Sequence, residues 1–197
     1  MIIDQTYFRR KLSLPQTGNT DGLADVLDFI DTYEPEYLQA VLGYDLWKAF
    51  NAGTEGSGLP DQRWQDLLTG AEFTRNGCTY KWPGFQNQVS KISPIANYVF
   101  YQFIDNKITD VVLVGTVASK TDNNREKSPL DRLVDTWNRM VDMNNTLYHF
   151  LKVKKSVYPE WKICGCGCYT VDLCGCGCGD DPAGERNLFK KINSLGL

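Results

Sequence analysis

Six cysteines near the carboxyl end of the chain form its most unusual chemical pattern. They lie in two identical runs, Cys164-Gly165-Cys166-Gly167-Cys168 and Cys174-Gly175-Cys176-Gly177-Cys178, which residues 169–173 separate. If each run is extended, side-chain alternation places its thiols on one face and its glycines on the other. The short connection allows a hairpin that brings the two rows of thiols together. Thiolates gathered in this way suit zinc or another soft metal, which takes about four sulfur ligands in a tetrahedron.

Three interpretations of these cysteines stay open. Their spacing differs from the Cys-x-x-Cys pairs of common zinc sites. Oxidation to disulfides after release from the cell is therefore one alternative, and close packing of glycine-rich strands between subunits is another. We prefer zinc, because thiolates stay available in a reducing cytoplasm.

The rest of the chain offers little catalytic chemistry. The single histidine, His149, lies among Tyr148, Phe150 and Leu151, and we predict a helix-surface or partly packed residue and not a base. Cys78 is interpreted as a small packing residue, because no histidine is close to it in the sequence. The sequence contains no dinucleotide-binding glycine fingerprint, P-loop or nucleophile elbow. We therefore expect a protein that is not an enzyme.

The composition is that of an ordinary globular chain. Its 197 residues are 42% hydrophobic and carry a net charge of −3, which suits one domain with an appendage and argues against generic wrapping of nucleic acid. No run approaches the roughly 18 apolar residues of a membrane span, and the first ten residues lack the apolar core of a signal peptide. We expect a protein made in a cytoplasm and without a membrane partner. The predicted organisation is an N-terminal arm at 1–19 that frays unless a neighbour holds it, a helical domain at 20–155 and a C-terminal extension at 156–197.

Two long helical patterns dominate the predicted domain. Apolar residues recur at steps of three and four over 89–104 and again over 130–151. Ser128 can cap the second helix, and Pro129 suits its first position. Because each helix has one polar side, we predict that the two pack as a long antiparallel pair in a small, mainly α bundle. Shorter helices are predicted at 21–33, at 34–42 (opened by Pro35), at 44–50 and at 61–68.

Two stretches depart from the helical period and predict β structure. Asn76-Gly77 lies between segments rich in Phe, Thr and Tyr, which predicts a hairpin within Glu72 to Trp82. A strand-like run from Asp110 to Ser119 belongs to an excursion at 109–127 between the long helices. Such an excursion either contacts something outside the domain or folds back on its own bundle. Its candidate partner contacts are Val111, Val112, Leu113, Asn123 and Arg125.

Basic and aromatic residues alternate just after the second long helix. Lys152, Lys154, Lys155 and Lys162 are interleaved with Tyr158 and Trp161. This cluster suits contact with DNA phosphates or an acidic partner, but it is equally typical of a solvated helix end, where lysines are favoured. Lys154, Lys155 and Trp161 are the candidate contacts here. Phe189 and Ile192 are further candidates, on a docking helix predicted at 185–197 from the helical spacing of its apolar residues.

The order of motifs along the chain resembles a known family. The stretches that carry the likeness are Phe29-Ile30-Asp31-Thr32-Tyr33-Glu34, Tyr37-Leu38-Gln39-Ala40-Val41-Leu42-Gly43-Tyr44-Asp45-Leu46-Trp47, Trp64-Gln65-Asp66-Leu67-Leu68-Thr69-Gly70 and Trp82-Pro83-Gly84-Phe85. They resemble head–tail connector proteins of tailed bacteriophages, also called head-completion or adaptor proteins, and above all those of phages of Bacteroidetes-type hosts. The likeness covers Asp21 to Lys152, and the cysteine-rich tail departs from it.

The resemblance implies a structural protein of the virion. Connector proteins are small helical bundles that form a homo-oligomeric ring, usually a dodecamer, beneath the portal vertex of the capsid. Such a ring joins the portal protein to the tail or to further ring proteins and lines the channel through which DNA passes without sequence-specific binding. The alternative is a cytoplasmic metal-binding protein, in which the helical bundle only carries the cysteine-rich tail.

Overall fold

The described part of the chain is built mainly of helices. The computed structural model describes residues 1–14, 20–55, 61–114, 129–162 and 189–193. Its helices are α1 (Thr20–Leu42), α2 (Tyr44–Thr54), α3 (Gln62–Thr69), α4 (Pro94–Val114) and α5 (Pro129–Val153), with short 3-10 turns η1 (Gln5–Tyr7) and η2 (Arg10–Leu12). Strands β1 (Ala71–Arg75) and β2 (Cys78–Trp82) form one small antiparallel sheet. The mainly α fold with a small β component is therefore confirmed, and none of these helices is long and apolar enough to cross a membrane.

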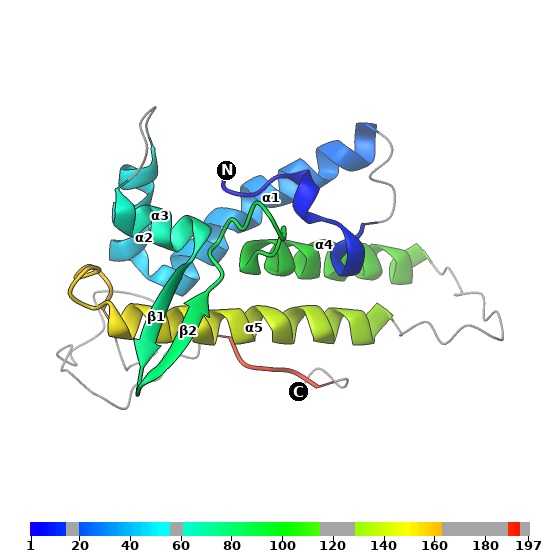
Figure 1. Ribbon diagram of the computed structural model, residues 1–197. Helices are drawn as coiled ribbons and strands as arrows, with labels where there is room; N and C mark the ends of the chain where they lie inside the picture. Colours follow the sequence, from blue (N-terminus) through cyan, green and yellow to red (C-terminus); the bar gives the residue numbers. More distant parts are fainter. Residues whose placement is uncertain (15–19, 56–60, 115–128, 163–188, 194–197) are drawn as a thin grey trace, which may run out of the picture.

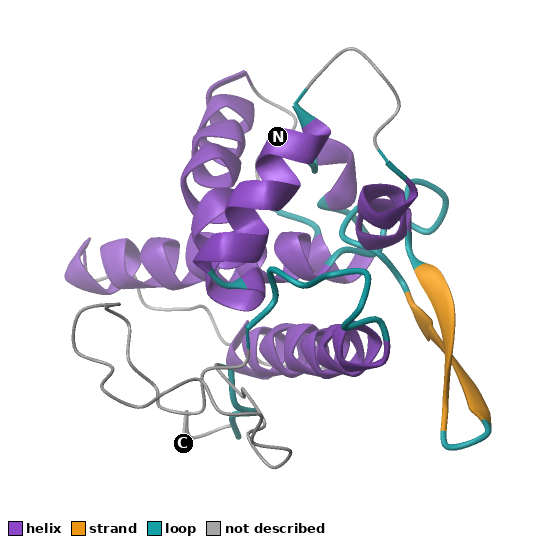
Figure 2. Cartoon of the chain, turned by 90° about the vertical axis from the view of Figure 1, so that its left-hand side faces the viewer, coloured by secondary structure: helices purple, strands orange, loops and turns teal. Residues whose placement is uncertain are grey.

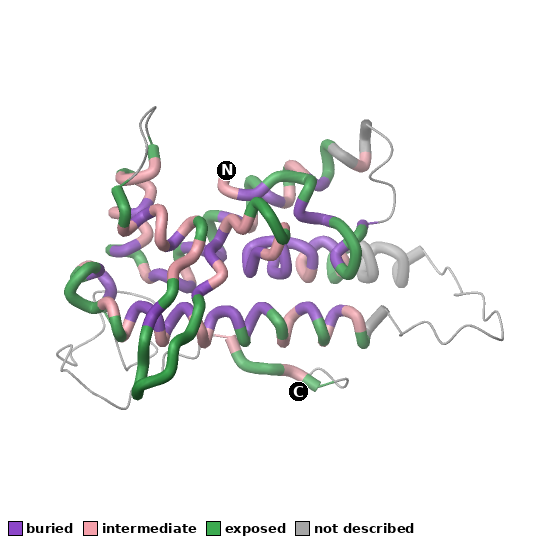
Figure 3. The backbone as a smooth tube through the Cα atoms, in the orientation of Figure 1, coloured by how far each residue is buried: buried purple, intermediate pink, exposed green. Residues whose placement is uncertain are grey.

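Helix α4 is the centre of the fold. Figure 1 shows it between α1 and α5, and both neighbours pack against it. Every residue from Ser93 to Phe100 is buried, as the burial colours of Figure 3 show. The beginning of α4 is thus covered all round, which corrects the expectation that it has one polar side. A helix that is apolar on every side occupies the interior of a layered fold, and α4 takes that place here.

The start of α4 follows local capping signals. The hydroxyl of Ser93 accepts a hydrogen bond from the backbone N–H of Ala96 at 3.3 Å, and Pro94 occupies the first helical position. Val89, predicted to lie on the apolar face of this helix, instead precedes it in a turn and is 93% exposed. Apolar spacing alone therefore placed the start too early, because Ser93-Pro94 ends the preceding segment.

Helix α1 runs without a break through Pro35, so the predicted start of a new helix there is wrong. Proline in a helix interior costs about 3 kcal/mol, because it removes one backbone hydrogen bond and crowds the preceding turn. Ile30, Tyr37, Leu38 and Val41 are all buried, at helical spacing on both sides of Pro35. Each such side chain contributes roughly 1.5–3 kcal/mol on burial, so one continuous stripe outweighs the cost of the proline.

The end of α4 overlaps the excursion expected at 109–127. Residues 109–114, which include Val111, Val112 and Leu113, continue the helix, so no strand begins at residue 110. Valine lowers helix stability by at most about 0.7 kcal/mol relative to alanine, and extending an existing helix avoids the cost of a new nucleus. Residues 115–127, including Asn123 and Arg125, lie outside the described part of the chain.

The predicted hairpin is confirmed. Strands β1 and β2 pair antiparallel from Ala71 opposite Trp82 to Arg75 opposite Cys78. Asn76 and Gly77 make the turn with positive φ values of 52° and 77°, as the predicted two-residue turn requires. Figure 2 shows this sheet at one side of the helices. Cys78 is exposed on β2, which corrects its interpretation as a packing residue.

Candidate interaction site on helix α5

The predicted metal ligands lie outside the described residues. Cys164, Cys166, Cys168, Cys174, Cys176 and Cys178 all belong to 163–188. In the described ranges, no three or more His, Cys, Asp or Glu side chains gather into a group that could hold a metal ion. Zinc coordination by the two cysteine runs therefore stays a prediction.

The predicted basic–aromatic cluster separates in three dimensions. Trp161 is 3% exposed and its ring stacks on Tyr148 at 6.5 Å, which corrects the surface role expected of it. Tyr158 is also buried, and its hydroxyl donates to the backbone oxygen of Arg63 at 2.6 Å. Lys155 is exposed and Lys154 half-buried. A partner contact at this end of α5 would thus come from the lysines alone.

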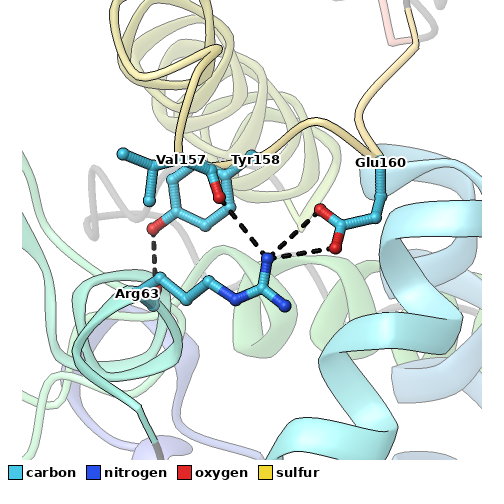
Figure 4. A network of polar contacts seen from close by, with 4 residues as sticks. All are labelled: Arg63, Val157, Tyr158 and Glu160. Carbon is cyan, nitrogen blue, oxygen red and sulfur yellow. Dashed lines mark hydrogen bonds and ion pairs between the residues drawn. The ribbon is translucent and has the colours of Figure 1, made fainter.

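The residues that follow α5 turn inward and connect the end of this helix to α3. The Arg63 guanidinium pairs with the Glu160 carboxylate at 3.0 Å and lies over the ring of Trp64 at 3.9 Å. Figure 4 shows the Arg63 guanidinium facing Glu160 and the backbone oxygen of Val157. The Tyr158 hydroxyl points to the backbone oxygen of Arg63 in the same view. The buried aromatic residues anchor the segment, because a half-exposed ion pair by itself contributes at most about 1 kcal/mol.

A basic cleft opens between η2, α4 and α5. Its volume is about 500 Å³, and its lining residues are Arg10, Lys11, Leu12, Ser13, Asn97, Arg132, Asp135, Thr136 and Arg139. Four of these side chains are cationic and one is a carboxylate, so the cleft suits an anionic group such as a phosphate. Sequence reasoning did not find this cleft, because its cations come from two segments more than 100 residues apart.

Arg132 lines the basic cleft and holds the N-terminal segment. Its guanidinium donates to the backbone oxygens of Lys11 at 2.7 Å and of Ser13 at 2.8 Å. It also lies over the ring of Phe100, 5.1 Å from the ring centre. Leu12, which lies between Lys11 and Ser13 in the chain, and Leu14, which follows them, are buried. The arm predicted to fray without a neighbour is thus held by its own domain over residues 1–14.

Arg132→Ala is expected to lower the free energy of unfolding by about 1 kcal/mol, since two partly exposed charge-assisted hydrogen bonds are lost. Arg139→Ala is the matched control, because Arg139 lines the same cleft and is exposed. That change is expected to alter stability by at most about 0.5 kcal/mol. Urea unfolding of both variants checks this, and equal effects would contradict a special role of Arg132.

The first residues of the chain are held by a buried carboxylate on α1. Glu34 is 5% exposed and accepts the backbone N–H of Ile2 at 2.7 Å and of Ile3 at 3.0 Å. Burial raises the pKa of this carboxyl above its ordinary value of 4.5, although the two N–H donors act in the opposite direction. Ile3 and Tyr7 are then buried against the helices.

The segment 189–193 docks on α5 through its backbone. The side-chain amide of Asn138 donates to the backbone oxygen of Ile192 at 2.8 Å and accepts the backbone N–H of Ile192 at 2.9 Å. The indole N–H of Trp137 donates to the backbone oxygen of Lys190 at 2.7 Å. Residues 189–193 are not helical, which corrects the docking helix over this part of 185–197. Their backbone groups are directed outward to α5 side chains and so cannot form helical hydrogen bonds within the segment.

Two of the stretches that carry the family resemblance pack against each other in the core. The indole N–H of Trp82 donates to the backbone oxygen of Leu67 at 3.1 Å, and the backbone N–H of Phe85 donates to the same oxygen at 3.0 Å. Trp82, Phe85 and Trp64 are buried. These residues therefore determine the fold around α3 and the hairpin, and they offer no exposed chemistry.

Comparisons with known proteins give no further identification. The chain matches no protein-family model, no curated protein and no solved structure. The candidate functional features of the described chain are thus the basic cleft and the two side chains of α5, Arg132 and Asn138, that clamp the backbone of distant segments.

Proposed function

We propose that this protein is a non-enzymatic assembly component of a tailed-phage particle. Copies of the chain form a ring that joins the portal vertex of the capsid to the tail and surrounds the channel for DNA. The proposal rests on the sequence resemblance to head–tail connectors and on one structural observation. Helix α5 holds backbone groups of segments from both ends of the described chain, through Arg132 and Asn138.

Backbone-directed clamps support an assembly role. Arg132 binds two carbonyl oxygens near residue 12, and Asn138 binds both backbone groups of Ile192. Such contacts recognise a docked segment by its main chain, so a suitable segment from a neighbouring subunit satisfies them equally well. Closed rings need the same two complementary surfaces on every copy, and a helical core with docked terminal segments supplies such pairs.

The charge distribution supports a DNA conduit. The whole chain carries a net charge of −3, whereas the basic cleft gathers Arg10, Lys11, Arg132 and Arg139. A basic cleft on an acidic protein gives local contact with phosphates without the strong overall attraction that slows DNA passage. In this proposal the basic cleft faces the channel or a phosphate-bearing surface beside it.

The mass of the purified protein and its presence in particles test the proposal. We expect sedimentation to give an oligomer with a mass several times 22.3 kDa, and mass spectrometry to find the protein in purified virions. Particles made without this protein are expected to be DNA-filled heads that lack tails. A stable monomer that is absent from virions and binds metal stoichiometrically would instead identify a metal-binding protein that acts through its cysteine tail.

A further inference from the structure

The docking face for residues 189–193 includes an aromatic pocket for Phe189. The rings of Tyr37, Tyr98 and Trp137 surround it, with ring centres 6.1, 5.8 and 5.6 Å from that of Phe189. Aromatic rings at these separations, here stacked on Tyr37 and edge-on to Tyr98 and Trp137, attract one another beyond simple burial. The pocket therefore selects an aromatic side chain at the first position of the docked segment.

Polar contacts orient the pocket from behind. The Tyr37 hydroxyl, fully buried, bonds to the side-chain oxygen of Asn144, and the Tyr98 hydroxyl donates to the Glu36 carboxylate at 2.7 Å. These bonds fix both rings whether or not Phe189 is present, because their partners, Asn144 and Glu36, belong to α5 and α1. A pocket whose walls are held in this way loses little conformational freedom when a peptide enters.

Side chains of α5 contact the next three positions of the segment, Lys190, Lys191 and Ile192. Asn138 holds both backbone groups of Ile192, and Trp137 holds the backbone oxygen of Lys190. Asp142 pairs with the Lys191 ammonium at 2.7 Å, and both side chains are more than half exposed. That ion pair adds at most about fivefold selectivity for a basic residue, so the main determinants are the aromatic anchor and the backbone bonds.

From these contacts we infer that Tyr37, Tyr98, Trp137, Asn138 and Asp142 form a docking face for an extended peptide of the order aromatic, basic, basic, aliphatic. Its occupant in the assembled protein is the segment 189–193 of a second copy of this chain. The inference rests on the proposed function for the presence of neighbouring copies, and it names the surface that links them. Exchange makes the same contacts between chains that the structure shows within one chain.

Covalent geometry allows this exchange. Residues 163–188 connect the end of the helical domain to the segment, and a chain of that length reaches up to about 85 Å when fully extended. A domain of this size has a radius of gyration of roughly 16 Å. A segment can therefore reach the docking face of an adjacent copy. Within one chain the segment acts at an effective concentration near millimolar. Where copies are held side by side, as in a ring, a neighbour's segment reaches a similar effective concentration, so docking between chains competes with docking within one chain.

A complementation experiment with full-length chains tests the inference. The first variant, Phe189→Ala with Ile192→Pro, keeps the docking face but loses the aromatic anchor and the N–H that Asn138 accepts. The second variant, Asn138→Ala with Asp142→Lys, keeps the segment but loses the amide clamp and repels Lys191. Each variant alone has only a weakened contact, whereas a mixture restores one intact contact, and only between chains.

We expect the mixture to associate with an apparent Kd about tenfold or more below that of either variant alone, measured by sedimentation with two labels. Asn145→Ala is the matched control for the clamp, because Asn145 is half-buried on α5 and makes no side-chain hydrogen bond to the described residues. It is expected to associate as the unaltered chain does. If a double variant fails to fold by circular dichroism, the single changes Phe189→Ala and Asn138→Ala replace it.

Three results would overturn the exchange. If each variant alone assembles as well as the unaltered chain, other surfaces hold the copies together, and the exchange is wrong while the proposed ring stands. If the unaltered chain forms rings but the mixture shows no gain over its components, the segment docks only within its own chain. If the unaltered chain is a monomer that is absent from particles, the proposed function fails, and the exchange fails with it.

Discussion

Gly84→Ala is expected to lower the free energy of unfolding by roughly 3–4 kcal/mol, among the larger effects of a single substitution. Gly84 has a φ of +88°, and a Cβ there would lie 2.5 Å from the backbone oxygen of Leu68. Its neighbour Phe85 donates its backbone N–H to Leu67 at 3.0 Å. An added methyl group would thus push apart two backbones whose separation this hydrogen bond fixes.

Gly77→Ala separates the two causes of that effect. Gly77 also has a positive φ, +77°, but a Cβ there would meet nothing within 4 Å. Its replacement is expected to cost only the conformational strain, about 1–2 kcal/mol. Urea unfolding of both variants gives the comparison. Equal losses for the two would show that the close approach around Gly84 adds nothing to stability.

Glu34→Ala is expected to lower the free energy of unfolding by roughly 2–3 kcal/mol at pH 7, because the buried N–H groups of Ile2 and Ile3 lose their acceptor. The variant also avoids the cost of burying the Glu34 carboxylate, which offsets part of this loss. Amide hydrogen exchange of Ile3 and Tyr7 should speed up more than that of α4, since the segment opens locally. Unchanged protection at Ile3 would contradict the clamp.

The pH dependence of this site has a definite sign. Burial, with a smaller contribution from the Asp31 carboxylate, raises the pKa of Glu34, while the backbone N–H groups of Ile3 and Ile2 and the amino group of Met1 lower it. Because the folded-state pKa is above the ordinary value of 4.5, the folded chain binds more protons than the unfolded chain between those two values. Stability from this group is fully present below the ordinary pKa and is lost as the pH rises through the folded-state pKa.

Glu34→Gln isolates this contribution, because glutamine has no charge to bury. The stability of the unaltered chain relative to Glu34→Gln should therefore fall as the pH rises from below 4.5 toward neutrality. Each unit by which burial raises the pKa corresponds to about 1.4 kcal/mol of that fall. A difference that is constant with pH, or that grows, would show that hydrogen bonding to the carboxylate outweighs its burial.

Local signals predicted those parts of the fold in which residues adjacent in the sequence determine the backbone conformation. The prediction of a turn at Asn76-Gly77 is confirmed, because few other residues adopt two positive φ values in succession. The sequence also carried the start of α4, since Ser93 and Pro94 form the same cap and first position that were recognised at Ser128 and Pro129. Apolar spacing by itself predicts an earlier start, because it does not register the cap at Ser93.

Local signals failed where distant contacts outweigh them. Pro35 predicted a helix start, yet buried residues on both sides keep α1 continuous. The valines after Asp110 predicted a strand, yet residues 109–114 extend α4. In both places the local preference against helix costs about 3 kcal/mol or less. Packing at Pro35 and the extension of an existing helix after Asp110 outweigh that cost, and neither can be read from the local stretch alone.

The sequence by itself determined that the chain is mainly helical with a hairpin at Asn76-Gly77. The tertiary structure alone decided where the side chains go. It turned Trp161 inward, brought Arg10 and Lys11 to Arg132, and placed Phe189 among rings from three helices. Apolar periodicity marks which residues are buried but not which residues they meet. Those meetings depend on the free energy of contacts between residues far apart in the chain.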